Sequence, residues 1–135
     1  RRTQDPPMAQ RCDTRSQIIS LGEDGVVRMT MQSGVFDLEL ADAQEVIRAV
    51  NTMCGGVRRP VLVDLRGLRS MTRECRKYFA GPETAEAESA VALLVMSPVA
   101  RAIGNFFMGL NKPLVPTRLF TSEPEAVVWL SGFVT

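Results

Sequence analysis

The sequence predicts a single α/β domain of two layers, in which helices pack on a mixed, mostly parallel β-sheet. One observation is compositional: 45% of the 135 residues are hydrophobic and 23% are charged, as in an ordinary globular domain with one core. The other is the order along the chain, where short apolar runs typical of strands alternate with segments of helical periodicity. Because crossovers join such strands, we expect a sheet wound as a right-handed β-α superhelix.

The first half of the chain opens with a predicted hairpin. Strands over 17–21 and 27–31 flank the tight reversal Asp24-Gly25, and apolar and polar residues alternate in the second strand. An extended segment over 35–40 follows. It leads into a helix over 41–54, where apolar side chains recur every three or four residues and two glycines end the pattern.

The second half repeats strand and helix. The apolar run over 61–65 indicates a central strand that is covered on both faces. Side chains suited to cap a helix start stand at Thr72, Ser97 and Ser122, and a proline follows Ser97. The expected elements are a helix from 72 to 80, a short acidic helix or turn over 83–88, a strand over 90–96, a helix over 97–110, a strand over 118–120 and a final helix from 122.

The N-terminal residues differ from the rest of the chain. Residues 1–15 are polar, contain four arginines and show no periodicity, so we expect a flexible arm there and a folded domain over 16–135. The arm lacks the apolar stretch of a signal peptide, and no apolar run reaches the roughly 20 residues of a membrane span. We therefore expect a cytoplasmic protein without a membrane span.

The residue types present disfavour several chemistries. The chain has no histidine, which removes the usual general base and histidine-dependent metal sites. Cys12, Cys54 and Cys75 are far apart, so we expect reduced thiols, no disulfide, no bound metal and no cofactor. The 16 basic and 15 acidic residues give a net charge of +1, which offers no global field for nucleic acid.

Two stretches resemble a known family. They are residues 61–68, VLVDLRGL, followed by a helix near Thr72, and residues 97–107, SPVARAIGNFF. Over roughly 16–134 the chain resembles the STAS (SpoIIAA-like) anti-sigma-factor antagonists, their SEC14-like relatives and a group of small, mostly uncharacterised bacterial proteins. The resemblance implies a SpoIIAA-like fold and a regulatory role through protein contacts.

In the antagonists, the loop after the central strand carries an Asp-Ser-Ser-Gly motif whose second serine is phosphorylated by a partner kinase. The matching positions here are Thr72, Arg73, Glu74 and Cys75, so the family's phosphoserine position holds Glu74. Its carboxylate either imitates a fixed negative charge at the helix start or is an ordinary first-turn glutamate. Ser70 and Thr72 are shifted acceptor candidates, although capping alone explains Thr72.

The same loop suggests an anion site. Arg66, Arg69 and Arg73 follow the central strand, and the helix start at Ser97 should open on the same edge of the sheet. These groups could together hold a phosphate or carboxylate. The alternative is that the arginines are simply solvated. Asp64, at the end of the strand, is either a buried base or a loop cap paired with Arg66.

A further candidate is an interface on the helix over 97–110. Phe106, Phe107 and Met108 are consecutive, and residues one apart lie about 100° apart around a helix, so one stripe cannot easily hide all three. Gly104 and Gly109 would cost stability unless another backbone approaches closely. We expect a partner-binding or self-association surface here; the alternative is a wide stripe that faces the core.

These observations favour a non-catalytic STAS-like regulatory or protein-interaction module, with a protein partner or self-association, for example as a dimer. The alternative is a carrier or sensor of a small anionic or lipid-like ligand, as the SEC14-like kinship implies. An enzyme is disfavoured, because no nucleophile and base are visibly paired.

Overall fold

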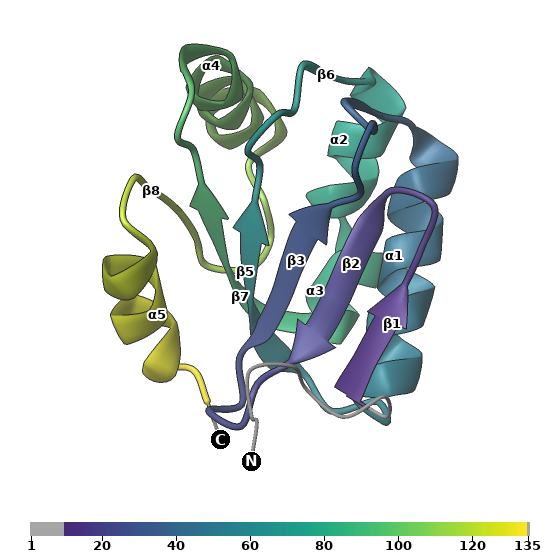
Figure 1. Ribbon diagram of the computed structural model, residues 1–135, viewed down its shortest axis with the longest axis vertical. Helices are drawn as coiled ribbons and strands as arrows, with labels where there is room; N and C mark the ends of the chain where they lie inside the picture. Colours follow the sequence, from purple (N-terminus) through teal and green to yellow (C-terminus); the bar gives the residue numbers. More distant parts are fainter. Residues whose placement is uncertain (1–9, 135) are drawn as a thin grey trace.

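The computed structural model describes residues 10–134, which form one six-stranded sheet with helices packed against it (Figure 1). The strand order is β1-β2-β3-β5-β7-β8. The first two pairings are antiparallel and the other three are parallel, which confirms the mixed, mostly parallel α/β prediction. The strands are β1 (Arg11–Asp13), β2 (Gln17–Leu21), β3 (Val27–Met31), β5 (Arg59–Asp64), β7 (Glu88–Leu94) and β8 (Thr117–Phe120).

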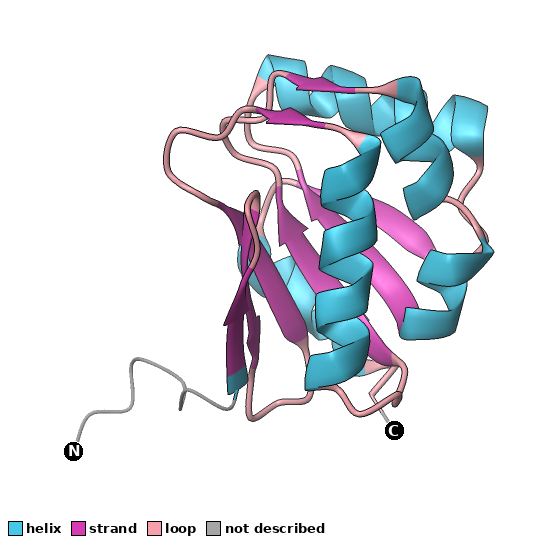
Figure 2. Cartoon of the chain, turned by 90° about the vertical axis from the view of Figure 1, so that its right-hand side faces the viewer, coloured by secondary structure: helices cyan, strands magenta, loops and turns pink. Residues whose placement is uncertain are grey.

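Helices lie on both faces of this sheet (Figure 2). The helices are α1 (Leu40–Met53), α2 (Arg73–Phe79), α3 (Pro82–Ala87), α4 (Pro98–Phe106) with its π-helical continuation η2 (Phe107–Asn111), and α5 (Glu123–Ser131). Helices α1 to α4 share one face, whereas α5 packs on the other face against β5, β7 and β8. The two predicted layers therefore become three over that part of the sheet.

The alternation of side chains along the strands explains why both faces are buried. In β5, Val61 and Val63 pack with the clusters beneath α1, α2 and α4, while Leu62 packs with the cluster beneath α5. Successive strand residues point to opposite faces, so a strand covered on both sides must be apolar at every position. This is the run from which a central strand was predicted.

The N-terminal boundary of the domain was predicted wrongly. Arg11–Asp13 form β1 and pair antiparallel with residues 18–20 of β2. The backbone N–H of Gln17 donates to the Thr14 hydroxyl at 2.9 Å, and this turn joins the two strands. A polar turn gives no hydrophobic periodicity, and residues 11–15 were therefore taken for part of the arm. The rest of that predicted arm, residues 1–9, lies outside the described residues.

A small second sheet connects two loops at the upper end of the molecule in Figure 1. Its strands are β4 (Asp37–Leu38) and β6 (Ser70–Met71), which pair in parallel. Only these two residues of the segment predicted to be extended over 35–40 form a strand, and α1 already begins at Leu40. The pairing fixes the loop that follows β5, where the anion site was predicted.

Candidate functional site

The three arginines of the predicted anion site have separate surroundings. The Arg66 Nη2 lies 2.6 Å from the Asp64 Oδ2, so Asp64 is the partner of Arg66 at the strand end. The Arg69 guanidinium lies over the Phe36 ring, 4.3 Å from its centroid. Arg73 is exposed at the first position of α2. These contacts do not bring the arginines together around one ligand position.

The hydroxyl groups at the two helix starts act as caps. The Ser97 Oγ accepts from the Ala100 N–H at 3.1 Å, and the Thr72 Oγ1 accepts from the Cys75 N–H at 3.2 Å. The predicted capping roles are therefore confirmed. Glu74 is exposed in the first turn of α2, where a carboxylate is favoured by the helix dipole. Ser70, the other shifted acceptor candidate, is exposed, and its hydroxyl donates to the Asp37 carboxylate at 2.6 Å.

The three residues of the predicted interface divide between surface and core. Phe106 is 52% exposed, whereas Phe107 is only 7% exposed and belongs to the core beneath α4. Met108 is partly buried and packs against the same core. The expectation that one of the three must leave the buried stripe is met by Phe106. Phe107 was wrongly assigned to the interface, because it faces the sheet.

A groove between α2 and η2 is the most distinctive surface feature near these residues. One wall is basic and comes from α2, and the other comes from η2; the lining residues are Arg73, Arg76, Lys77, Ala80, Leu110 and Asn111. The Arg76 Nη1 donates to the Met71 carbonyl at 2.7 Å, and its guanidinium lies 5.0 Å from the centroid of the Phe106 ring. This cation–π contact joins the basic wall to the exposed apolar side of α4.

The sequence did not predict that these residues form one groove. Arg73, Arg76 and Lys77 are spaced i, i+3 and i+4, which places them along one side of a helix. That spacing would have separated Arg73 from Arg66 and Arg69. The wall opposite could not be inferred, because it depends on how η2 packs beside α2.

A second hollow lies in the interior, between the sheet and the helices. Its volume is about 60 Å³ and most of its lining is apolar, but Gln17 and Glu88 also face it. An engineered apolar cavity of about 150 Å³ holds a single benzene molecule. This hollow is therefore too small for the lipid-like ligand of the carrier alternative.

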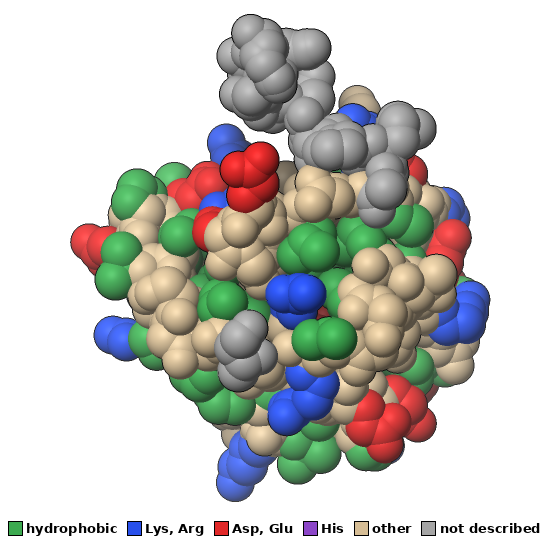
Figure 3. All heavy atoms as spheres, turned by 90° about the horizontal axis from the view of Figure 1, so that it is seen from below, with side chains coloured by type: hydrophobic (Ala, Val, Ile, Leu, Met, Phe, Trp, Pro, Cys, Tyr) green, Lys and Arg blue, Asp and Glu red, His purple; other side chains and the backbone are tan. Residues whose placement is uncertain are grey.

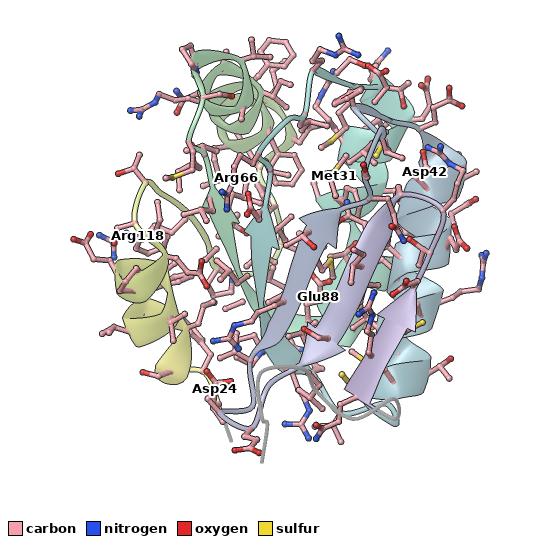
Figure 4. All side chains as sticks on the ribbon, viewed as in Figure 1. Asp24, Met31, Asp42, Arg66, Glu88 and Arg118 are labelled. Carbon is pink, nitrogen blue, oxygen red and sulfur yellow. The ribbon has the colours of Figure 1, made fainter. Side chains whose placement is uncertain are left out.

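Glu88 is buried because of an irregularity in the sheet. The register between β5 and β7 shifts by one residue beside Arg59, so that Glu88 stands opposite Arg59 and Ala90 opposite Pro60. Burial raises the pKa of the Glu88 carboxyl to about 8, since the charged form is poorly solvated in the interior. Glu88 stands at the start of β7 and Arg66 follows the end of β5, so the two lie toward opposite ends of the sheet (Figure 4).

The described residues contain no group of three or more side chains suited to hold a metal ion. Within the same range, 10–134, no helix is long and apolar enough to cross a bilayer.

The thiol of Cys75 is buried in the core. Burial raises its pKa to about 12, so the thiolate is not formed near neutral pH.

These features define a class of protein: a SpoIIAA-like α/β domain with a mostly parallel sheet. Two solved structures have this fold. One, an uncharacterised protein of the DUF3478 family from Shewanella loihica PV-4, is 16% identical, with a TM-score of 0.56 over 85% of this chain and 92% of that one. The other, the unphosphorylated anti-sigma factor antagonist SpoIIAA, is 17% identical, with a TM-score of 0.55 over 87% and 99% of the two chains.

The family model for a domain of unknown function, DUF7793, matches residues 20–134, and the chain belongs to that family. A protein of unknown function from Arthrobacter sp. FB24 is 36% identical over 84% of this chain and 97% of its own, with a TM-score of 0.30. The comparison with curated proteins gives no match.

Proposed function

We propose that this protein is a non-catalytic regulatory module that binds a partner protein or a second copy of itself through the α4–η2 surface. The observation that carries the proposal is the exposure of large apolar side chains on and directly after these two elements: Phe106, Leu110 and Leu114 are 52%, 63% and 65% exposed. Neighbouring apolar side chains left in water mark interaction surfaces, because burying them against a partner is favourable.

Three features of the chain support a role without catalysis. The sequence contains no histidine. The Cys75 thiol, with its pKa raised to about 12, is too poorly ionised to serve as a nucleophile. Glu88 has a pKa suited to acid–base chemistry but is 3% exposed, so a substrate cannot reach it.

The regulatory part of the proposal is supported by the fold shared with SpoIIAA, a protein described as an anti-sigma factor antagonist. Glu74 stands where the STAS motif has its phosphorylated serine. The side chain is exposed in the first turn of α2, so its charge is available to a partner without a kinase. Regulation of this chain would then depend on partner concentration and not on phosphorylation at position 74.

Site-specific photo-crosslinking in the native host cell tests this function. A photoreactive residue replaces Phe106 in one variant and Val128, which is 73% exposed on α5, in a matched control. We expect a discrete cross-linked species from position 106 that is lost when Leu110→Glu is added. The same yield of cross-links from both positions, or none from 106, would contradict a binding surface on α4–η2.

A further inference from the structure

We propose that the groove between α2 and η2 binds an acidic amphipathic helix of a partner protein. The inference rests on the proposed function and adds the chemistry of the partner. It follows from three observations: positive charge on one wall that no acidic side chain of the described residues pairs with, exposed apolar side chains on and beside the other wall, and open space at a glycine next to them.

The basic wall carries charge that the protein itself does not neutralise. In the described part of the chain, no acidic side chain pairs with Arg73, Arg76 or Lys77, although four other arginines form ion pairs. No acidic residue lines the groove either. A partner that places carboxylates there would gain complementary contacts, and a basic partner would be repelled.

Exposed apolar side chains lie on and beside the η2 side of the groove. Leu110 lines the groove, Phe106 stands at the end of α4, and Leu114 follows the end of η2; all three are exposed. The Leu114 N–H donates to the Ala80 carbonyl at 3.2 Å, which holds the segment after η2 against the end of α2. An amphipathic helix docks into such a groove through apolar anchors three or four residues apart.

The two glycines of this segment have different surroundings. A Cβ on Gly104 would lie 3.0 Å from the Leu119 Cδ2 and 3.3 Å from the Val95 Cγ1, so packing against the sheet explains the absence of a side chain. A Cβ on Gly109 would meet nothing within 4 Å. Gly109 therefore leaves room beside Leu110 for an approaching backbone, and it lies in a π-helical turn, a feature frequent at functional sites.

The groove favours a partner helix over an anionic membrane. Its charge lies on one wall and its apolar residues on the other, which matches the two faces of an amphipathic helix lying between them. A membrane surface would favour an apolar patch with basic residues around it. The opposite end of the molecule, seen from below in Figure 3, lacks this separation of charge and apolar surface, because hydrophobic, basic and acidic side chains are interspersed there.

A selection from a displayed library of helix-forming peptides tests the proposal. The full chain is immobilised through its C-terminal end, which lies away from α4 (Figure 1). Binders are measured by fluorescence anisotropy against the wild type, the Leu110→Glu variant, the double variant Arg73→Glu/Lys77→Glu and the control Val128→Glu. Circular dichroism and thermal unfolding verify that each variant is folded.

We expect the selected peptides to combine apolar residues at helical spacing with aspartate or glutamate on the flanks. The double variant should weaken their binding at least tenfold and should bind versions with lysine in place of the acids better than the wild type does. Leu110→Glu should abolish the binding of both the acidic peptides and their lysine versions, and Val128→Glu should leave the binding of either kind unchanged.

Other outcomes overturn the proposal in distinguishable ways. Peptides that depend on Leu110 but are neutral or basic would leave the interaction surface in place and refute the acidic partner. An absence of binders, or binders unaffected by Leu110→Glu, would refute the proposed function at this surface as well. Binding of vesicles of phosphatidylglycerol and phosphatidylcholine, lost in both groove variants, together with no peptide binding, would identify a membrane surface instead.

Discussion

Glu88→Gln replaces a buried carboxyl by an amide of nearly the same shape that carries no charge at any pH. The carboxyl is buried at the start of β7, and in the described part of the chain no cation lies within ion-pairing distance of it. Its pKa is raised from 4.5 to about 8 by the loss of solvation. Between pH 4.5 and about 8, the Glu88 carboxyl therefore keeps its proton in the folded state, whereas in the unfolded chain it has already released it.

The magnitude follows from this pKa difference. Below pH 4.5 both states are protonated and no free energy is lost. As the pH rises toward 8, the free energy of unfolding of the wild type falls by about 1.4 kcal/mol per pH unit, and above 8 it levels off. Over the full range the loss amounts to about 5 kcal/mol, a large share of the roughly 5–15 kcal/mol typical of a domain.

Urea unfolding at pH 5, 6, 7, 8 and 9 measures this effect. The difference in stability between Glu88→Gln and the wild type should shift in favour of the variant by several kcal/mol from pH 5 to pH 9. Glu86→Gln, an exposed position on α3, is the matched control and should show a constant difference. A constant difference for Glu88→Gln would refute the reasoning and would indicate that Arg59, its neighbour in register, pairs with the carboxylate.

Three further predictions concern the core, a cap and a thiol. Phe107→Ala should destabilise the fold by about 3–5 kcal/mol, whereas Phe106→Ala should cost under about 1 kcal/mol, as measured by urea unfolding; equal losses would contradict the division between core and surface. Asp42→Asn should cost about 1–2 kcal/mol at pH 7, since the Asp42 carboxylate accepts from Arg15 at 2.7 and 2.8 Å and caps α1. The Arg15 guanidinium lowers the pKa of Asp42, so this loss should shrink as the pH falls from 7 through the acidic range, and a loss independent of pH would refute it. The Cys75 thiol, with its pKa raised to about 12, should resist iodoacetamide at pH 8 in the native protein and react after unfolding, as followed by mass spectrometry; rapid native labelling would contradict its burial.

The strand and helix order was largely predictable because each element carries its own local signal. The apolar run over 61–65 and the cap at Ser97 need no distant partner to be recognised. Strand β1 carries no such signal: it is three residues long and is held by pairing with β2. The π-helical turn η2 was also missed, since a run of helical periodicity does not reveal where the hydrogen-bonding pattern widens.

The candidate site was predicted less well than the fold. The sequence placed Phe106, Phe107 and Met108 on one helix and required one of them to be exposed, but it could not identify which. Arg66 and Arg69 were grouped with Arg73 by proximity in the chain, whereas Asp64 and Phe36 engage the first two. Such partners come from strand ends and loops whose approach depends on packing, which short-range spacing does not encode.

The amino-acid sequence alone determined the α/β class, the central strand, the helix caps and the absence of histidine chemistry. These depend on backbone preferences, side-chain periodicity and residue type, all of which act over a few neighbouring residues. Tertiary structure decided that Phe107 is buried and Phe106 exposed, that Glu88 lies in the interior, and that η2 forms a groove with the basic side of α2. The physical reason is that burial and the contacts across a groove depend on which distant segments meet, and the folded sheet alone brings those segments together.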